Sequence, residues 1–235
     1  MADVDEPLKR AASLFEDAER CQDQGRFEDA EKLVAEAKNL VAGNPQACAE
    51  IDLFRAISLL KANKREEGVR NLSEILAEYS DWFKTPNSRD VYEMVQLQRA
   101  FSLAHLERTE EALPLLEEAS SFRLERAVQS DLHCHLGRCY HERSRYAQAK
   151  EHFERAEALG VGEDWRPAFH YYFGYTLYEL KDFQRAKRQF ILCLQSGDSG
   201  PPASMRYAML AETSRKLGKH SEARPYEEKA KSVER

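Results

Sequence analysis

Residues 130–162 read SDLHCHLGRCYHERSRYAQAKEHFERAEALGVG, and this stretch decides the fold. Its small and bulky apolar residues recur at helical spacing, namely Leu136, Gly137, Tyr140, Ala149, Phe153 and Ala156. Two antiparallel helices approach closely only where a small side chain faces the neighbouring helix, and bulkier side chains fill the gaps around that contact. The stretch therefore predicts two packed helices joined by the short polar turn Arg143-Ser144-Arg145.

The same pattern recurs along the chain. The first small residue of each unit is Ala18, Ala56, Ala100, Gly137, Gly174 or Ala211, at successive spacings of 38, 44, 37, 37 and 37 residues. Four further polar turns fit this period, at residues 24–26, 107–109, 180–182 and 217–219. A single helix pair cannot bury its apolar face, so such units stack on one another. We therefore predict an all-α array of about six helix-turn-helix units.

These units resemble tetratricopeptide repeats over about residues 8–234, although His133 stands where that family usually has Trp. The resemblance implies a right-handed α-solenoid, an α-α superhelix that forms one domain over residues 8–235 after a flexible N-terminus at 1–7. The repeats are expected at about 8–45, 46–80, 90–127, 128–162, 163–199 and 201–234. The 44-residue spacing predicts an extended loop at 80–90, which carries the exposed-looking aromatics Trp82 and Phe83.

Two residue types add local expectations. Pro114 and Pro225 fall past the first turn of a second helix, so those helices either start late or kink. Trp82 and Trp165 each follow an Asp near a repeat junction, and we expect them to cover the seam there, with Trp82 as an alternative partner contact.

Composition excludes several classes of protein. The 235 residues include only 10 Gly and 8 Pro, which argues against enzyme folds built on glycine-rich loops. A net charge of −6 argues against a nucleic-acid-binding domain, and no apolar run is long enough to span a membrane. The N-terminus is acidic where a secretory signal would be basic, and the five cysteines are scattered. We expect a cytoplasmic protein with reduced thiols, binding neither nucleic acid nor membrane.

The resemblance also implies where a partner binds, because the first helices of such repeats line a concave groove. The candidate groove residues are apolar or aromatic with a few basic groups: Leu53, Ile57, Leu97, Phe101, Arg138, His141, Tyr171, Tyr175 and Tyr178. Tyr171, Tyr175 and Tyr178 follow the i, i+4, i+7 spacing of one helix face. Tyrosines with one apolar face and one hydroxyl suit a peptide or helix of a partner protein. Core packing between neighbouring repeats is the alternative role for these tyrosines.

One subset of the family holds the C-terminal carboxylate of chaperones with Lys and Asn side chains. The matching positions in this chain are Phe15, Glu19, Leu53 and Ile57, which argues against that specificity. We therefore predict a non-catalytic interaction module for a protein or peptide ligand, without a cofactor.

A cluster of Cys and His residues in the fourth unit suggests another role. It comprises His133, Cys134, His135, Cys139 and His141. A structural zinc site needs four convergent ligands, whereas helical spacing places these residues on different faces. A Cys–His nucleophile would also need an orienting group and oxyanion donors, and neither is evident. We expect no metal site and no enzyme, and we read the cysteines as small apolar residues.

Charge asymmetry supports a structural alternative. Residues 1–45 contain 11 acidic and 6 basic residues, whereas residues 201–235 contain 5 acidic and 8 basic residues. Opposite charges at the two ends would steer copies of the chain into head-to-tail self-association, which salt would weaken. A homo-oligomeric scaffold therefore remains open beside the peptide-binding module.

Overall fold

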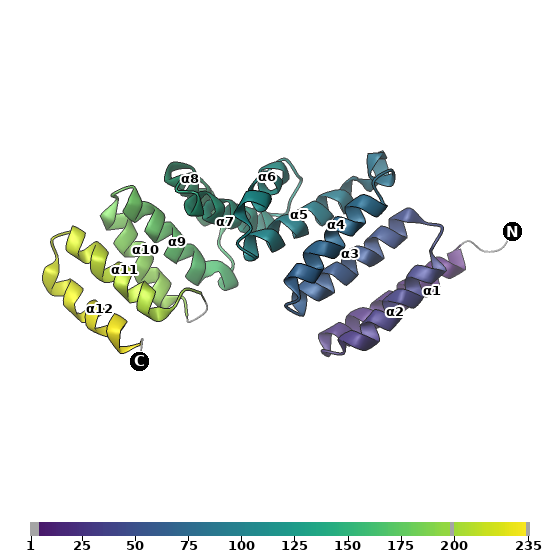
Figure 1. The fold of residues 1–235 in the computed structure, drawn as a ribbon, viewed down its shortest axis with the longest axis horizontal. Coiled ribbons are helices and arrows are strands. Elements are labelled where there is room, and N and C mark those ends of the chain that lie inside the picture. The colour runs from purple at the N-terminus through teal and green to yellow at the C-terminus, as the bar shows by residue number, and fades with distance from the viewer. Residues whose placement is uncertain (1–4, 198–199, 234–235) are drawn as a thin grey trace. The chain divides into compact units, whose positions relative to one another are not determined.

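The computed structural model of the protein describes residues 5–197 and 200–233. These residues form twelve α-helices and three short 3-10 helices, with no β-strand among them (Figure 1). They group into two compact units: unit 1 ends at Leu115, and unit 2 begins at Leu116.

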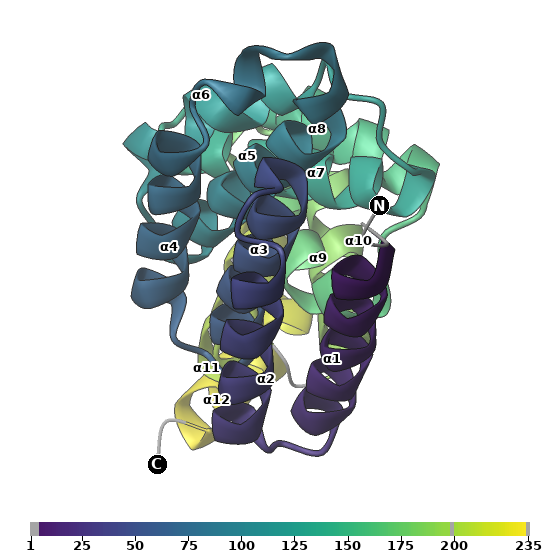
Figure 2. The ribbon, with the colours of Figure 1, turned by 90° about the vertical axis from the view of Figure 1, so that its right-hand side faces the viewer.

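Unit 1 consists of helix pairs in which each helix contacts the next. Its helices are α1 (Asp5–Asp23), α2 (Phe27–Leu40), α3 (Pro45–Lys61), α4 (Arg65–Glu78) and α5 (Arg89–His105), with the short 3-10 helices η1 (Trp82–Lys84) and η2 (Pro86–Ser88) before α5. Helix α2 packs on α1 and α3, as Figure 2 shows, and α4 packs on α3 and α5. Helix α3 also contacts α5, so the first helices of successive pairs lie side by side. Helix α6 (Thr109–Ala119) contains the boundary between the units.

Unit 2 repeats this arrangement. Its helices are α7 (Arg126–Glu142), α8 (Tyr146–Leu159), α9 (Arg166–Glu179), α10 (Phe183–Gln195), α11 (Ala203–Lys216) and α12 (His220–Ser232), with the 3-10 helix η3 (Glu163–Trp165) before α9. Helix α9, the first helix of its pair, contacts both α7 and α11. Helix α8 packs on α9, and α10 packs on α11. No helix among the described residues has both the length and the apolar composition needed to cross a membrane.

The turns inside the helix pairs share one backbone geometry. In the described residues, six such turns contain a residue with positive φ: Gly25, Asn63, Glu107, Ser144, Lys181 and Gly218. In the first turn, the N–H of Gly25 donates to the carbonyl of Gln22 and that of Arg26 to the carbonyl of Cys21, both at 2.8 Å. This paired bonding ends a helix by the Schellman motif. The turn at Asn63, which the sequence pattern did not reveal, follows the same rule.

The core of unit 2 depends on glycines that face phenylalanine rings. A Cβ atom at Gly137 would lie 2.6 Å from Cε1 of Phe153, and a Cβ at Gly174 would lie 2.9 Å from Cε1 of Phe190. Both rings are fully buried. Glycine is therefore required at these two positions because the helix backbone of α7 or α9 lies directly against a ring of the following helix.

The first two pairs, in unit 1, use a larger residue in place of glycine and a smaller one in place of phenylalanine. Sixteen residues after Gly137 and Gly174 stand Phe153 and Phe190, whereas sixteen residues after Ala18 and Ala56 stand Val34 and Leu72. These four residues of unit 1 are also buried. In the pair of Ala56 and Leu72 the summed side-chain volume is therefore kept close to that of Gly137 and Phe153, as close packing requires, whereas Val34 is smaller and borders open space.

The structure refines several local expectations. The proline-containing helices α6 and α12 begin at Thr109 and His220, so neither starts late; the prolines lie inside the helices. The predicted flexible segment 1–7 is helical from Asp5 onward, and residues 1–4 lie outside the described residues. Trp82 and Phe83 are half-buried and pack against the core of unit 1, so these aromatics are not exposed.

We predict that Gly137→Ala destabilises the protein by about 1 kcal/mol, because crowding against Phe153 outweighs the better helix propensity of alanine. Phe153→Leu makes room for the added methyl group. The double variant should therefore be more stable than the sum of the single effects indicates, by about 1 kcal/mol. Urea unfolding of the four proteins measures this coupling, and additive single effects would contradict the packing described here.

Candidate functional site

Unit 2 brings together four of the predicted groove residues, Arg138 and His141 of α7 with Tyr175 and Tyr178 of α9. All four are half-buried, and we call them the tyrosine patch. The ring centroids of His141 and Tyr175 lie 5.0 Å apart, and those of Tyr175 and Tyr178 lie 6.4 Å apart. The patch therefore forms where the first helices of two successive pairs meet.

His141 occupies the centre of an aromatic cluster. Its ring makes edge contacts with Tyr146 of α8 at 5.6 Å and with Tyr172 of α9 at 5.5 Å, in addition to Tyr175. Its Nδ1 atom lies 3.0 Å from Oγ1 of Thr176. That hydroxyl donates to the carbonyl of Tyr172, so it accepts from His141 and fixes the Nδ1–H tautomer. Burial lowers the pKa of His141 to about 4, so the imidazole is neutral at pH 7.

The tyrosines of the patch also stay uncharged. Burial raises the pKa of Tyr175 and Tyr178 above its ordinary value, and the nearby Glu179 carboxylate adds to the effect. The hydroxyl of Tyr178 donates to Oε1 of Glu212 on α11 at 3.3 Å. Beside Arg138, the patch therefore offers neutral aromatic faces with hydroxyl groups on its two tyrosines, and such side chains are enriched where protein partners bind.

Charged side chains surround the patch in opposite-sign pairs. Nε of Arg138 lies 3.4 Å from the Glu142 carboxylate. Glu212 lies 2.5 Å from Arg215 and 3.8 Å from Lys216. These pairs are partly exposed, so they contribute little stability and instead form a polar rim.

Three of the predicted groove residues belong to the interior instead. Leu53, Leu97 and Tyr171 are only 8%, 3% and 5% exposed. The Tyr171 ring packs 6.1 Å from that of Phe190, so it points toward α10. The three tyrosines of the i, i+4, i+7 stripe therefore differ in burial: Tyr171 lies in the core, and the other two are half-buried. Ile57 and Phe101, the remaining candidates, are half-buried in unit 1.

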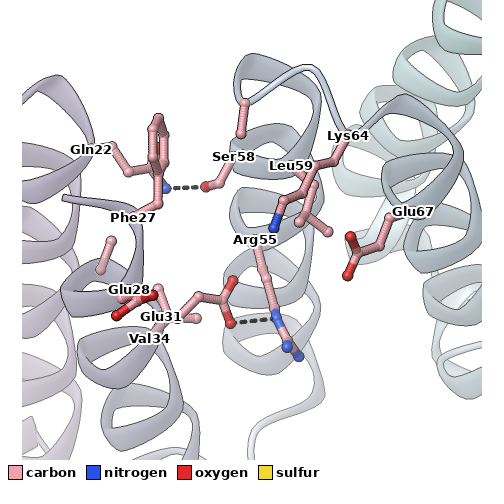
Figure 3. A pocket seen from close by; sticks show the side chains of 12 residues that line it. Gln22, Phe27, Glu28, Glu31, Val34, Arg55, Ser58, Leu59, Lys64 and Glu67 are labelled. Atoms are coloured by element: carbon pink, nitrogen blue, oxygen red, sulfur yellow. Dashed lines mark hydrogen bonds and ion pairs between the residues drawn. The ribbon is translucent and has the colours of Figure 1, made fainter. Parts of the chain in front are cut away.

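A cleft that the sequence analysis missed lies in unit 1 between α2, α3 and the start of α4 (Figure 3). Its volume is about 260 Å³. Apolar side chains from these helices form part of its wall, namely Phe27, Ala30, Val34, Leu59 and Ala62. Gln22 donates a hydrogen bond to Ser58 at one end, and Arg55 pairs with Glu31 at 2.8 Å at the other (Figure 3). We call this site the α2–α3 cleft.

The repeat pattern contains the signal for this cleft. Val34 stands where the fourth unit has Phe153, and Arg55 stands where the fifth unit has Phe173. The two phenylalanine rings pack 5.5 Å apart and are fully buried. Two rings of the repeat packing are therefore replaced in unit 1 by a smaller side chain and a charged one. A comparison of all equivalent positions between repeats, and not only of the recurring small residues, would have predicted the α2–α3 cleft.

The Cys and His side chains of the fourth unit lie in different places and do not converge on one site. Cys134 and Cys139 are fully buried, and the buried His135 ring contacts Trp165 edge-on at 4.5 Å. His133 instead lies beside His152 of α8, with their Nδ1 atoms 3.1 Å apart. Within residues 5–197 and 200–233, no group of three or more His, Cys, Asp or Glu side chains is arranged to hold a metal ion. Burial also raises the pKa of the Cys134 thiol, so this cysteine is a poor nucleophile.

We predict that His141 makes stability fall as the pH drops from about 6.5 to about 4. The folded pKa lies below that of the unfolded chain, so in this window the unfolded chain binds more protons. The stability contributed by neutral His141 is complete above this window and is lost within it. For a half-buried imidazole the loss is on the order of 1–3 kcal/mol. The stability difference between the natural chain and His141→Gln, followed by urea unfolding, should therefore shrink between pH 7 and pH 4; a constant difference would contradict it.

Comparison with known proteins supports the helical-repeat architecture. A model of the tetratricopeptide repeat matches residues 130–159, the stretch nearest the repeat pattern. No curated protein sequence matches the chain. The structure of PilF from Pseudomonas aeruginosa is similar, with a TM-score of 0.67 and 20% identity over 94% of this chain and 90% of that one.

Two further structures are similar at comparable coverage. PilW, described as a type IV pilus biogenesis factor, is 13% identical and gives a TM-score of 0.65 over 94% of this chain and 92% of its own. A tetratricopeptide repeat protein from Parabacteroides merdae is 16% identical and gives 0.63 over 96% and 80%. At these identities the likeness concerns the fold, and it confirms the predicted all-α helical-repeat class. A tetratricopeptide repeat is therefore identified at residues 130–159, within a chain whose fold is similar to that of PilF.

Proposed function

We propose that the protein is a non-catalytic interaction module that binds a peptide or helix of a partner protein at the tyrosine patch. The observation that carries this proposal is the neutral, half-buried cluster of His141, Tyr175 and Tyr178 on the first helices of successive pairs. Burying tyrosine faces releases water from apolar surface, while the hydroxyls can still donate to a partner's backbone carbonyls. The charged pairs around the patch would form the rim of such an interface.

Unit 1 contributes fewer candidate contact residues than the sequence pattern predicted. Ile57 and Phe101 keep partly exposed surface and remain candidates for partner contacts within unit 1. The buried residues Leu53, Leu97 and Tyr171 act through packing, so we exclude them from the contact surface.

We also propose that the protein works in the cytoplasm. All five cysteines are unbridged and buried, and reduced thiols are typical of cytoplasmic proteins, which supports this proposal.

We predict that Tyr175→Ala/Tyr178→Ala weakens partner capture by about tenfold or more, because aromatic residues at the centre of an interface dominate binding energy. The matched control is Tyr207→Ala, which removes a half-buried tyrosine of α11 whose ring faces Lys229 of α12. Quantitative mass spectrometry of proteins retained from a lysate of the source cells compares the three chains. Circular dichroism verifies that each variant is folded. Equal retention by the double variant and the control would contradict the proposal.

Head-to-tail self-association is the second candidate, because it follows from the uneven charge of the chain. The acidic α1 exposes Glu16 and Glu19, whereas α12 exposes Arg224, Lys229 and Lys231. At about 20 mM salt the attraction between opposite charges is only weakly screened. We predict that sedimentation velocity at this salt concentration shows assembly that depends on protein concentration, and that about 500 mM salt abolishes the assembly. A monomer at high protein concentration in low salt would remove this candidate.

A further inference from the structure

The α2–α3 cleft differs from the tyrosine patch in place and chemistry, and neither the repeat packing nor the proposed function uses it. In unit 2 the equivalent positions are filled by Phe153 and Phe173, which are fully buried. In unit 1, Val34 and Arg55 leave open space beside apolar groups. The consequence appears at Leu59, which is half-buried, while its equivalent Leu177 is fully buried. Part of the core of unit 1 is therefore left uncovered by the chain itself.

The size and wall of the cleft suit an aromatic ring. An apolar cavity of about 150 Å³ is enough to bind benzene, and this cleft measures about 260 Å³. Phe27, at its mouth, is 40% exposed, which is unusual for a phenylalanine and leaves one ring face available for stacking. The Arg55 guanidinium, which occupies the sequence position of the Phe173 ring, can cover a bound ring as Arg185 covers Phe173 at 5.6 Å in unit 2.

The charges at the cleft favour particular residues next to a bound aromatic side chain. Glu28, Glu31 and Glu67 line it together with two cations, Arg55 and Lys64. Arg55 already pairs with Glu31. Among the described residues, no ion pair engages Glu28 or Glu67, so an excess of negative charge remains. A segment with basic residues next to the aromatic one would be attracted, and an acidic segment would be repelled.

We propose that the α2–α3 cleft binds the aromatic side chain of a partner protein, presented by a segment that carries Lys or Arg beside it. The partner ring takes the place that Phe153 and Phe173 fill in unit 2 and covers Leu59. This contact is separate from the one at the tyrosine patch, so the two proposals can fail independently.

The direct test uses the full-length, ¹⁵N-labelled chain and three capped peptides, followed by amide chemical shifts. The probes are Ac-Gly-Lys-Trp-Lys-Gly-NH2, the same peptide with Leu in place of Trp, and the same peptide with both Lys changed to Glu. The Lys-Trp-Lys peptide should shift amides in residues 27–34 and 55–67 and bind about tenfold more tightly than either of the other two. Equal binding of the Trp and Leu peptides, or shifts confined to the tyrosine patch, would overturn the proposal.

Two variants close the cleft by different routes. Ala62→Trp places a bulky side chain at its edge, and the matched control Leu180→Trp makes the equivalent change in unit 2. Ala18→Gly/Val34→Phe instead introduces the glycine–phenylalanine pair of the fourth unit. Each folded cleft variant should lose binding of the Lys-Trp-Lys peptide by about tenfold, while Leu180→Trp retains it.

The chain alone supplies the remaining control. Shifts of residues 27–34 and 55–67 that depend on protein concentration without peptide would identify a second copy of the chain as the occupant, and would overturn the proposal. Retained peptide binding by either folded cleft variant would overturn it as well.

Discussion

Close contact between a small residue of one helix and a large residue of the next is the constraint on which this fold depends. Gly137 lies against Phe153, and Gly174 lies against Phe190, so near that a single Cβ atom has no room. In the other units alanine stands at this position of the first helix, so the residue there is small in every unit. The period of the chain is therefore a packing requirement, which the left-handed residue in each turn maintains by reversing the chain at the same point.

The same constraint decides which surface remains for partners. Where two rings fill the space between pairs, as in unit 2, the binding surface that we propose lies on the first helices and their half-buried tyrosines. Where Val34 and Arg55 replace the rings, as in unit 1, the space is open and is the second site that we propose (Figure 3). Hydrogen bonds at equivalent positions, a buried one between Gln22 and Ser58 and a partly buried one between His141 and Thr176, join successive pairs in both units. The scaffold is thus shared, and the filling of its gaps varies.

The sequence predicted the helix pairs and five of their turns, since both follow from the spacing of small residues and polar turn residues. It did not reveal the turn at Asn63, because the second unit departs from the pattern, with Ile75 where the other units have a small residue. It also grouped Tyr171 with Tyr175, whose rings lie 6.3 Å apart, but Tyr171 is buried beside Phe190 whereas Tyr175 is half-buried. Helical spacing defines a stripe, but how deeply each member is buried depends on which neighbouring helix covers it. The cleft was missed for a related reason: a missing ring is visible only when repeats are compared position by position.

Volume compensation can be tested most directly in the second helix pair, where Ala56 and Leu72 occupy the positions of Gly137 and Phe153 and are both fully buried. The decisive measurement is the unfolding free energy of Ala56→Gly, Leu72→Phe and the double variant. The compensation rule predicts that Leu72→Phe alone is destabilising and that adding Ala56→Gly recovers about 1 kcal/mol or more, despite the poor helix propensity of glycine. A double variant as unstable as the sum of its two single changes would contradict the rule.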